Sequence, residues 1–211
     1  MARFDVALEI NKQQTTLVIL TALAIKLNQA AIRAKPRIQA KLVSAVETAI
    51  LASPEALSLQ GGRLQGELGV VNPEEAIHAV IATLQKNIVV NLTPFFVQGD
   101  GLGGGLAIGI SRRDMSDLLA LPEGKFVSEG GYDIPWLKWL LTTGDEILVP
   151  GYHFQGGNYF DRSRTGLGIM EKKGGWEVPL GFRGTLENNW ITRALVPLGS
   201  VVNRILREEI R

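Results

Sequence analysis

Tyr132-Asp133-Ile134-Pro135-Trp136-Leu137-Lys138-Trp139-Leu140-Leu141 opens the stretch around which the chain is organised. The stretch runs to residue 195 and holds the four tryptophans of the chain, at positions 136, 139, 176 and 190. Aromatic side chains bury large apolar areas, so this segment is expected to dominate the core. It shows no catalytic arrangement of residues, and the sequence therefore favours a structural or interaction protein over an enzyme.

Length and composition predict one folded domain, or one domain with an appendage. The chain has 211 residues, of which 45% are hydrophobic and 20% charged, close to the average of globular proteins. Its 22 Lys and Arg against 21 Asp and Glu leave a net charge of +1, so the whole chain does not attract a polyanion and dedicated nucleic-acid binding is disfavoured. The absence of cysteine excludes disulfides and thiolate metal sites and fits assembly in the cytosol.

The N-terminal quarter is predicted to be helical. Leu17–Ile25 is an apolar run about half as long as the roughly 20 residues that span a bilayer, which favours a buried helix. Asp5 and Glu9 stand where a signal peptide would carry positive charge, so no export signal is expected. From Lys12 to Ala52 the residues favour helix. Pro36 should kink or divide this helix, and two helical pieces are expected. After it, apolar residues recur at helical spacing: Ile38, Leu42, Ala45, Val46 and Ile50.

The centre of the chain is predicted to hold one further helix and a hairpin. Asn72-Pro73-Glu74-Glu75 is a typical helix start, and this helix should end near Asn87. Residues 88–93 and 95–97 read as strand, residues 106–110 as the returning strand, and Gly99 to Gly105 as the turn between them. A short helix is expected in 113–121.

The C-terminal part should supply two more short strands, 146–149 and 176–178, and a last helix. Thr185 is a suitable cap for that helix, and Pro197 should bend it. The predicted fold class is therefore α+β, a small and mostly antiparallel sheet packed with long N-terminal and C-terminal helices. In domain terms, 1–35 is a helical extension, and 36–211 is an α+β domain with an insertion near 94–134.

Gly99-Asp100-Gly101-Leu102-Gly103-Gly104 matches the dinucleotide motif G-x-G-x-x-G. A phosphate-binding loop of this type must open a helix, whereas the residues that follow alternate with glycine like a strand. A flexible hairpin is thus the favoured interpretation, and a nucleotide-binding enzyme is the alternative. No cofactor is expected.

Other reactive side chains give no recognisable site. His78 and His153 lack a carboxylate at metal-ligand spacing, so neither a metal centre nor a histidine base is predicted. The carboxylates of the central region are scattered and are interpreted as solvated charge: Asp114, Asp117, Glu123, Glu129, Asp133, Asp145 and Glu146.

Aromatic and basic residues are the interface candidates. Trp136 and Trp139 share a helical face and either pack in the core or contact another subunit. Arg162 and Arg164 flank a turn and either bind phosphate or a neighbour's acid, or are simply solvated.

Several elements together resemble the tail-completion and neck proteins of tailed bacteriophages. They are Gly62-Arg63-Leu64, the W-x-x-W-L-L-x-x-G element from Trp136 to Gly144, the Ser163–Met170 turn, Trp176-Glu177-Val178-Pro179, and a Gly184-Thr185 segment leading to N-x-x-x-R-A-L at Asn189–Leu195. The resemblance covers about residues 38–196. This chain differs from the smaller members by its N-terminal segment and by the insertion Pro94 to Ile134.

The resemblance implies a structural virion protein without catalytic activity. It would form a six-fold or twelve-fold homo-oligomeric ring in the neck, assembled in the host cytoplasm, between a portal or connector-adaptor protein and a tail terminator protein. DNA would only pass through the ring lumen as genome, and no membrane partner is implied. With Trp136, Trp139, Arg162 and Arg164, the residues Trp190 and Arg193 of the last motif complete the candidate interface. Another tail or baseplate protein is the alternative within the same class.

Overall fold

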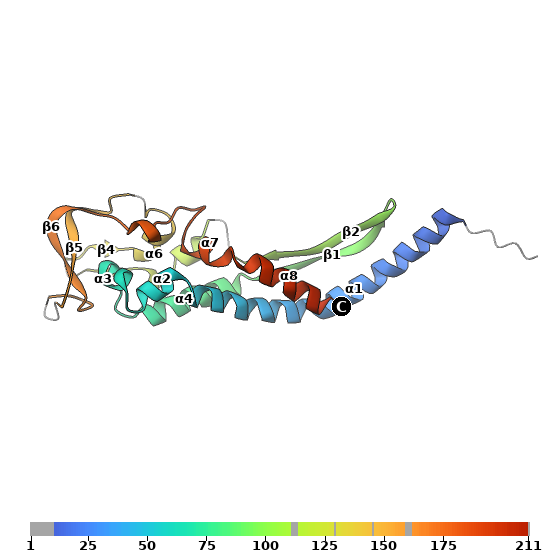
Figure 1. Cartoon of the computed structure of the whole chain (residues 1–211), viewed down its shortest axis with the longest axis horizontal. Helices are drawn as coiled ribbons and strands as arrows, with labels where there is room; N and C mark the ends of the chain where they lie inside the picture. The colour runs from blue at the N-terminus through green and yellow to red at the C-terminus, as the bar shows by residue number, and fades with distance from the viewer. Residues whose placement is uncertain (1–10, 111–113, 129, 145, 159–161, 211) are drawn as a thin grey trace, which may run out of the picture.

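The computed structural model describes residues 11–110, 114–128, 130–144, 146–158 and 162–210. The chain is elongated: short helices and strands gather at one end, which we call the head, and a helix and a hairpin project from it (Figure 1). The predicted α+β class is confirmed. The strands form three separate two-stranded antiparallel sheets rather than one.

Helix α1 (Lys12–Leu51) is one continuous helix of 40 residues. Its first turn is capped by the side chain of Asn11, which accepts from the Gln14 amide at 3.2 Å. The prediction of two helical pieces is wrong, because Pro36 lies inside α1 without ending it. Figure 1 shows the N-terminal part of α1 inclined to the rest, and an internal proline is the usual cause of such a bend.

The second half of α1 forms the floor of the core. Ile38, Leu42, Val46 and Ile50 are fully buried, as the periodicity predicted. They pack with α4 (Pro73–Lys86), which begins and ends as predicted, and with α8 (Leu198–Glu209).

The head is built from short elements. They are α2 (Pro54–Leu59), α3 (Arg63–Leu68), α5 (Ser116–Leu119), η1 (Pro122–Gly124), β3 (Phe126–Val127), β4 (Asp133–Ile134), α6 (Trp136–Leu141), β5 (Val149–Gly156), β6 (Gly168–Trp176), η2 (Leu180–Phe182) and α7 (Trp190–Leu195). The short helix expected in 113–121 is α5, and position 113 itself lies outside the described residues. The predicted strands 146–149 and 176–178 are wrong in extent, because only Val149 and Trp176 of them lie in strands. These two residues pair at the open end of the longer β5–β6 hairpin.

The last helix differs from its prediction in two features, the residue that caps it and the effect of Pro197. It begins at Trp190 with Asn189 as its cap, in a reciprocal pair of hydrogen bonds with Thr192. Thr185 instead accepts from the Asn188 amide at 3.1 Å and shapes the preceding turn. Pro197 does more than bend the helix, because it separates α7 from α8.

The projecting hairpin consists of β1 (Val89–Gln98) and β2 (Gly101–Gly109). A hairpin was predicted here, but its turn is only Gly99-Asp100, and the later glycines belong to β2. Gly104 faces an irregularity in β1 between Thr93 and Phe96, and a β-carbon at Gly104 would lie 2.4 Å from the Pro94 carbonyl oxygen. Glycine is needed at 104 for this close approach and for its φ of +100°.

Candidate functional site

The tryptophans hold the head together. The indole nitrogen of Trp136 donates to the Glu123 carbonyl at 2.9 Å, and that of Trp190 to Ser53 Oγ at 2.7 Å. Trp176 donates to the buried carboxylate of Glu67 at 2.8 Å. Since buried N–H groups need partners, these bonds fix three rings in position.

Two of the interface candidates therefore belong to the core. Trp136 is 1% exposed and Trp190 is 0% exposed, so their rings pack inside the chain and are not offered to another subunit. Trp139 is half-buried, with its ring centroid 5.6 Å from that of Trp176. Trp136 thus packs in the core, which is one of the two interpretations given for the Trp136 and Trp139 pair.

The two arginines of the turn have different surroundings. Arg162 is exposed. The guanidinium carbon of Arg164 lies 3.9 Å from the centroid of the Phe126 ring, and its Nη1 donates to the Val127 carbonyl at 3.2 Å. Arg164 is exposed as well, and it ties the turn to β3.

Arg193, the last interface candidate, makes a partly buried ion pair across the chain. Its Nε and Nη2 contact Glu55 Oε1 at 3.0 and 2.6 Å, and its Nη1 donates to the Arg183 carbonyl at 2.8 Å. Glu55 is 1% exposed. Removing Arg193 would leave the buried carboxylate of Glu55 without a counter-charge, so the pair joins α7 firmly to α2.

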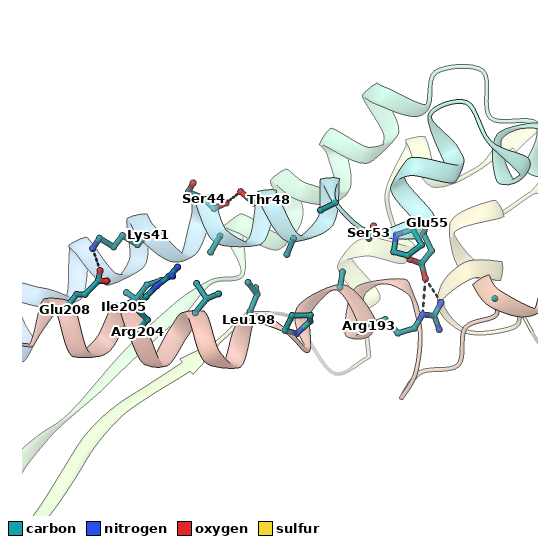
Figure 2. A pocket seen from close by; sticks show the side chains of 18 residues that line it. Lys41, Ser44, Thr48, Ser53, Glu55, Arg193, Leu198, Arg204, Ile205 and Glu208 are labelled. Atoms are coloured by element: carbon teal, nitrogen blue, oxygen red, sulfur yellow. Dashed lines mark hydrogen bonds and ion pairs between the residues drawn. The ribbon is translucent and has the colours of Figure 1, made fainter.

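A groove runs between α1 and the α7–α8 pair, with a volume of about 980 Å³. Figure 2 shows Leu198 and Ile205 of α8 facing α1 along it, the Lys41–Glu208 pair at one end and the Glu55–Arg193 pair at the other. The α1 side is made of small residues: Ser44, Ala45, Thr48, Ala49 and Ala52. Small side chains on one helix let another helix approach closely. The groove is thus a long apolar channel with charged ends.

Glu55 leaves one atom of this groove unsatisfied. Its Oε2 is buried and has no hydrogen-bond partner in the part of the chain that the structure describes. A buried carboxylate oxygen without a donor is costly. At this end of the groove, Glu55 is therefore bonded through only one of its two carboxylate oxygens.

The ion pairs at the other end involve two acids of α8. Lys41 Nζ lies 3.0 Å from Glu208 Oε2 and 2.7 Å from Glu209 Oε1, and Arg37 also bonds Glu209. The bond from Lys41, followed by that from Arg37, lowers the pKa of Glu209 below its ordinary value. The bond to Glu209, followed by that to Glu208, raises the pKa of Lys41.

The first turns of α1, Lys12–Ile25, form what we call the arm. The prediction that Leu17–Ile25 is buried is wrong: Leu17 is 54%, Val18 66%, Ile19 59%, Leu23 43% and Ile25 55% exposed. Among the described residues, α1 is long and apolar enough to cross a membrane, judged by length and composition alone. A helix that is apolar on all sides is normally covered by protein or lipid.

The β1–β2 hairpin is fastened to α1 next to the arm. The side-chain amide of Asn28 donates to the Phe95 carbonyl at 2.9 Å and accepts from the Phe95 amide at 2.7 Å. Ala24, Ala31 and Ala34 are buried on α1, while Ile32 remains 63% exposed. As a separate two-stranded sheet, the hairpin has two open edges.

The remaining sequence candidates do not come together. The glycine motif at Gly99–Gly104 continues into β2, whereas a phosphate loop would open a helix. His78 lies beside Glu74 and Glu75, and His153 Nδ1 is buried without a partner among the residues described. No group of three His, Asp or Glu side chains suited to a metal is found within those same residues. Of the scattered carboxylates, Glu129 and Asp145 lie outside them.

Sequence reasoning missed the groove. Lys41 and Glu208 are 167 positions apart, and Glu55 and Arg193 are 138 positions apart. Each pair meets only because the C-terminal helices return along α1. One signal was available, because Ala45, Ala49 and Ala52 recur at spacings of four and three on a helix. That spacing predicts a smooth helical stripe, but not what faces it.

Comparison with known proteins gives no relative: no family model, no curated protein and no solved structure matches this chain.

Proposed function

We propose that this chain is a structural subunit that assembles through its arm, and specifically a neck component of a tailed bacteriophage. The observation that carries the assembly proposal is the exposure of the apolar arm. Five side chains between Leu17 and Ile25 are 43–66% exposed. Full burial of an aliphatic side chain contributes roughly 1.5–3 kcal/mol, so covering these five would contribute about 5 kcal/mol or more before association costs.

The neck assignment adds the place of assembly and rests on the motif resemblance. The shared elements meet in the head, where the Glu67 carboxylate of α3 accepts from Trp176 and also bonds Arg63 of the Gly62-Arg63-Leu64 element. Gly184 passes so close to α6 that an added β-carbon would lie 1.8 Å from the Leu140 carbonyl oxygen. These contacts support the proposal that the quoted elements form one structural module.

A membrane-inserted arm is the second candidate, favoured by the length and hydropathy of α1. The hairpin argues against a full span. Asn28 binds it beside the arm, and a bilayer cannot satisfy the open edges of a two-stranded sheet. The uncovered stretch Lys12–Leu23 alone rises about 17 Å, roughly half the thickness of a bilayer core. A protein partner therefore fits the geometry better.

The test compares the full chain with a variant lacking residues 1–23, which ends before the buried Ala24 and keeps Asn28. Light scattering and negative-stain images should show rings for the full chain and monomers for the deletion. Adding full-length protein to neckless particles of its source phage should restore tails. Monomers at all concentrations, with no docking on such particles, would refute the proposal. Flotation of the full chain with liposomes would favour the membrane candidate.

A further inference from the structure

We propose that the arm of one subunit docks in the α1–α8 groove of a second copy, so that each subunit gives an arm and receives one. This inference rests on the proposed assembly and names the two surfaces that meet. Its observations are the exposed arm and the apolar groove.

The arm that fills the groove must come from another molecule. Both surfaces lie on α1, with the arm at Lys12–Ile25 and the groove floor between Lys41 and Ala52. The two centres are about 28 residues apart on one continuous helix, or roughly 40 Å at 1.5 Å per residue. Because a helix cannot fold back on itself, the chain's own arm cannot reach its own groove.

The groove and the arm match in length and apolar character. The uncharged run Leu17–Ile25 rises about 12 Å, and the groove floor from Lys41 to Ala52 rises about 17 Å. A channel of about 980 Å³ that is long and open along α1 suits a helix better than a compact small molecule. The alanines of the floor leave room for the branched side chains of the arm.

Apolar contact, rather than ion pairing, carries the docking. Lys12 and Lys26 bracket the apolar run of the arm and lie about 21 Å apart along the helix. The groove is lined by more basic than acidic side chains, and both of its acids already have a basic partner: Lys41, Arg193 and Arg204 against Glu55 and Glu208. The match between the two surfaces therefore lies in their length and apolar character.

Arm-to-arm pairing is less favourable than arm-to-groove pairing. No Asp or Glu occurs between Glu9 and Glu47, whereas Lys12, Lys26 and Arg33 all lie in the first part of α1. Two arms side by side in parallel would bring like charges together. The arm and the groove are also different patches, and the pairing of two different patches is what closes a ring.

Thiol cross-linking tests the contact directly, because the chain has no cysteine of its own. Leu20→Cys in the arm is mixed with Ala49→Cys in the groove, each on the otherwise full chain, with a small tag on one variant to separate the products by mass. Leu20→Cys mixed with Val71→Cys is the control, since Val71 is 50% exposed and does not line the groove. The arm and groove pair should cross-link at least about tenfold faster than the control, because docking raises the local thiol concentration.

The second test blocks the groove with a larger side chain. Ala49→Arg should abolish assembly by blocking the groove, while Leu57→Arg, at a site 60% exposed outside the groove, should not. Circular dichroism checks that both variants fold, and if Ala49→Arg unfolds, Ala49→Gln replaces it.

The outcomes separate the inference from the proposed function. Rings that form without the arm–groove cross-link, or Leu20→Cys cross-linking mainly to itself, would overturn the docking inference and leave the assembly proposal standing. Monomers under all conditions would overturn both. Binding of the arm to liposomes but not to a second copy of the chain would also overturn the inference.

Discussion

The hydrogen bond between Trp190 and Ser53 should be a measurable support of the head, and a double-mutant cycle isolates it. Ser53 Oγ accepts from Trp190 at 2.7 Å and also caps α2 by accepting from the Ala56 amide at 3.2 Å. Ser53→Ala therefore removes a helix cap, worth about 1 kcal/mol, and leaves the buried indole N–H unsatisfied, which costs about 1–3 kcal/mol. It also removes the bond that Ser53 Oγ donates to the Ile50 carbonyl at 2.6 Å, worth about 1 kcal/mol. We expect a loss of about 3–5 kcal/mol in total.

The same substitution should cost much less when the indole is absent. In the Trp190→Phe background no indole N–H is left unsatisfied, so Ser53→Ala loses only the cap and the bond to Ile50 and should cost about 2 kcal/mol. The coupling should therefore be about 1–3 kcal/mol. Urea unfolding measures all four proteins at one fixed protein concentration, because assembly adds a concentration-dependent term to stability. Equal costs of Ser53→Ala in both backgrounds, within about 0.5 kcal/mol, would refute the reasoning. Trp190→Ala, which empties a fully buried site, should lose about 3–5 kcal/mol and sets the upper limit.

Three further outcomes follow from single contacts. Gly184→Ala should lower the urea midpoint strongly, since the new β-carbon would meet a main-chain oxygen at 1.8 Å; a midpoint equal to that of the wild type would show that this backbone can shift. Gly104→Ala should speed proteolysis of the hairpin, whereas Gly109→Ala, which faces open space, should not; equal cleavage of both would contradict the proposed close approach. Glu209 should titrate below its ordinary pKa of 4.5, so that its stabilising contribution is complete above pH 4.5 and is lost as the pH falls through the lower folded pKa. Carbon NMR of the carboxyl group measures this, and Lys41→Met should move the midpoint back up; an unchanged midpoint would exclude Lys41 as its main cause.

Local signals predicted the regular elements well. The apolar spacing at Ile38, Leu42, Val46 and Ile50 marks the face of α1 that becomes fully buried, and the Asn72-Pro73 start marks α4. In both places the local preference and the tertiary packing agree. The α+β class followed from the same signals.

The errors arose where a local rule competed with long-range packing. Pro36 removes one hydrogen bond, but about four turns of helix follow it and are held by the core, so α1 continues through it. Thr185 is a good cap in isolation, but Asn189 forms a reciprocal capping pair that also buries its side chain. Both outcomes depend on residues distant from the local motif.

The candidate site was the least predictable part. An apolar run such as Leu17–Ile25 has the same composition whether it fills a core or awaits a partner, so its sequence favoured burial. Glu55 and Arg193 are separated by 138 positions, and no local pattern reports such a pair. The groove forms only because α8 runs back along α1.

The continuity of α1 also has a mechanical consequence. One rod of 40 residues, about 60 Å long, carries the arm at one end and the groove floor at the other. A sideways pull on the tip is therefore transmitted as torque toward the floor, and the rod is weakest at Pro36, where a main-chain hydrogen bond is missing. Bending there would absorb the load before it reaches Leu42 and the packed head. Pro36 thus acts as a compliant joint between two stiff segments, and replacing it with alanine would make the rod stiffer and the head more sensitive to force.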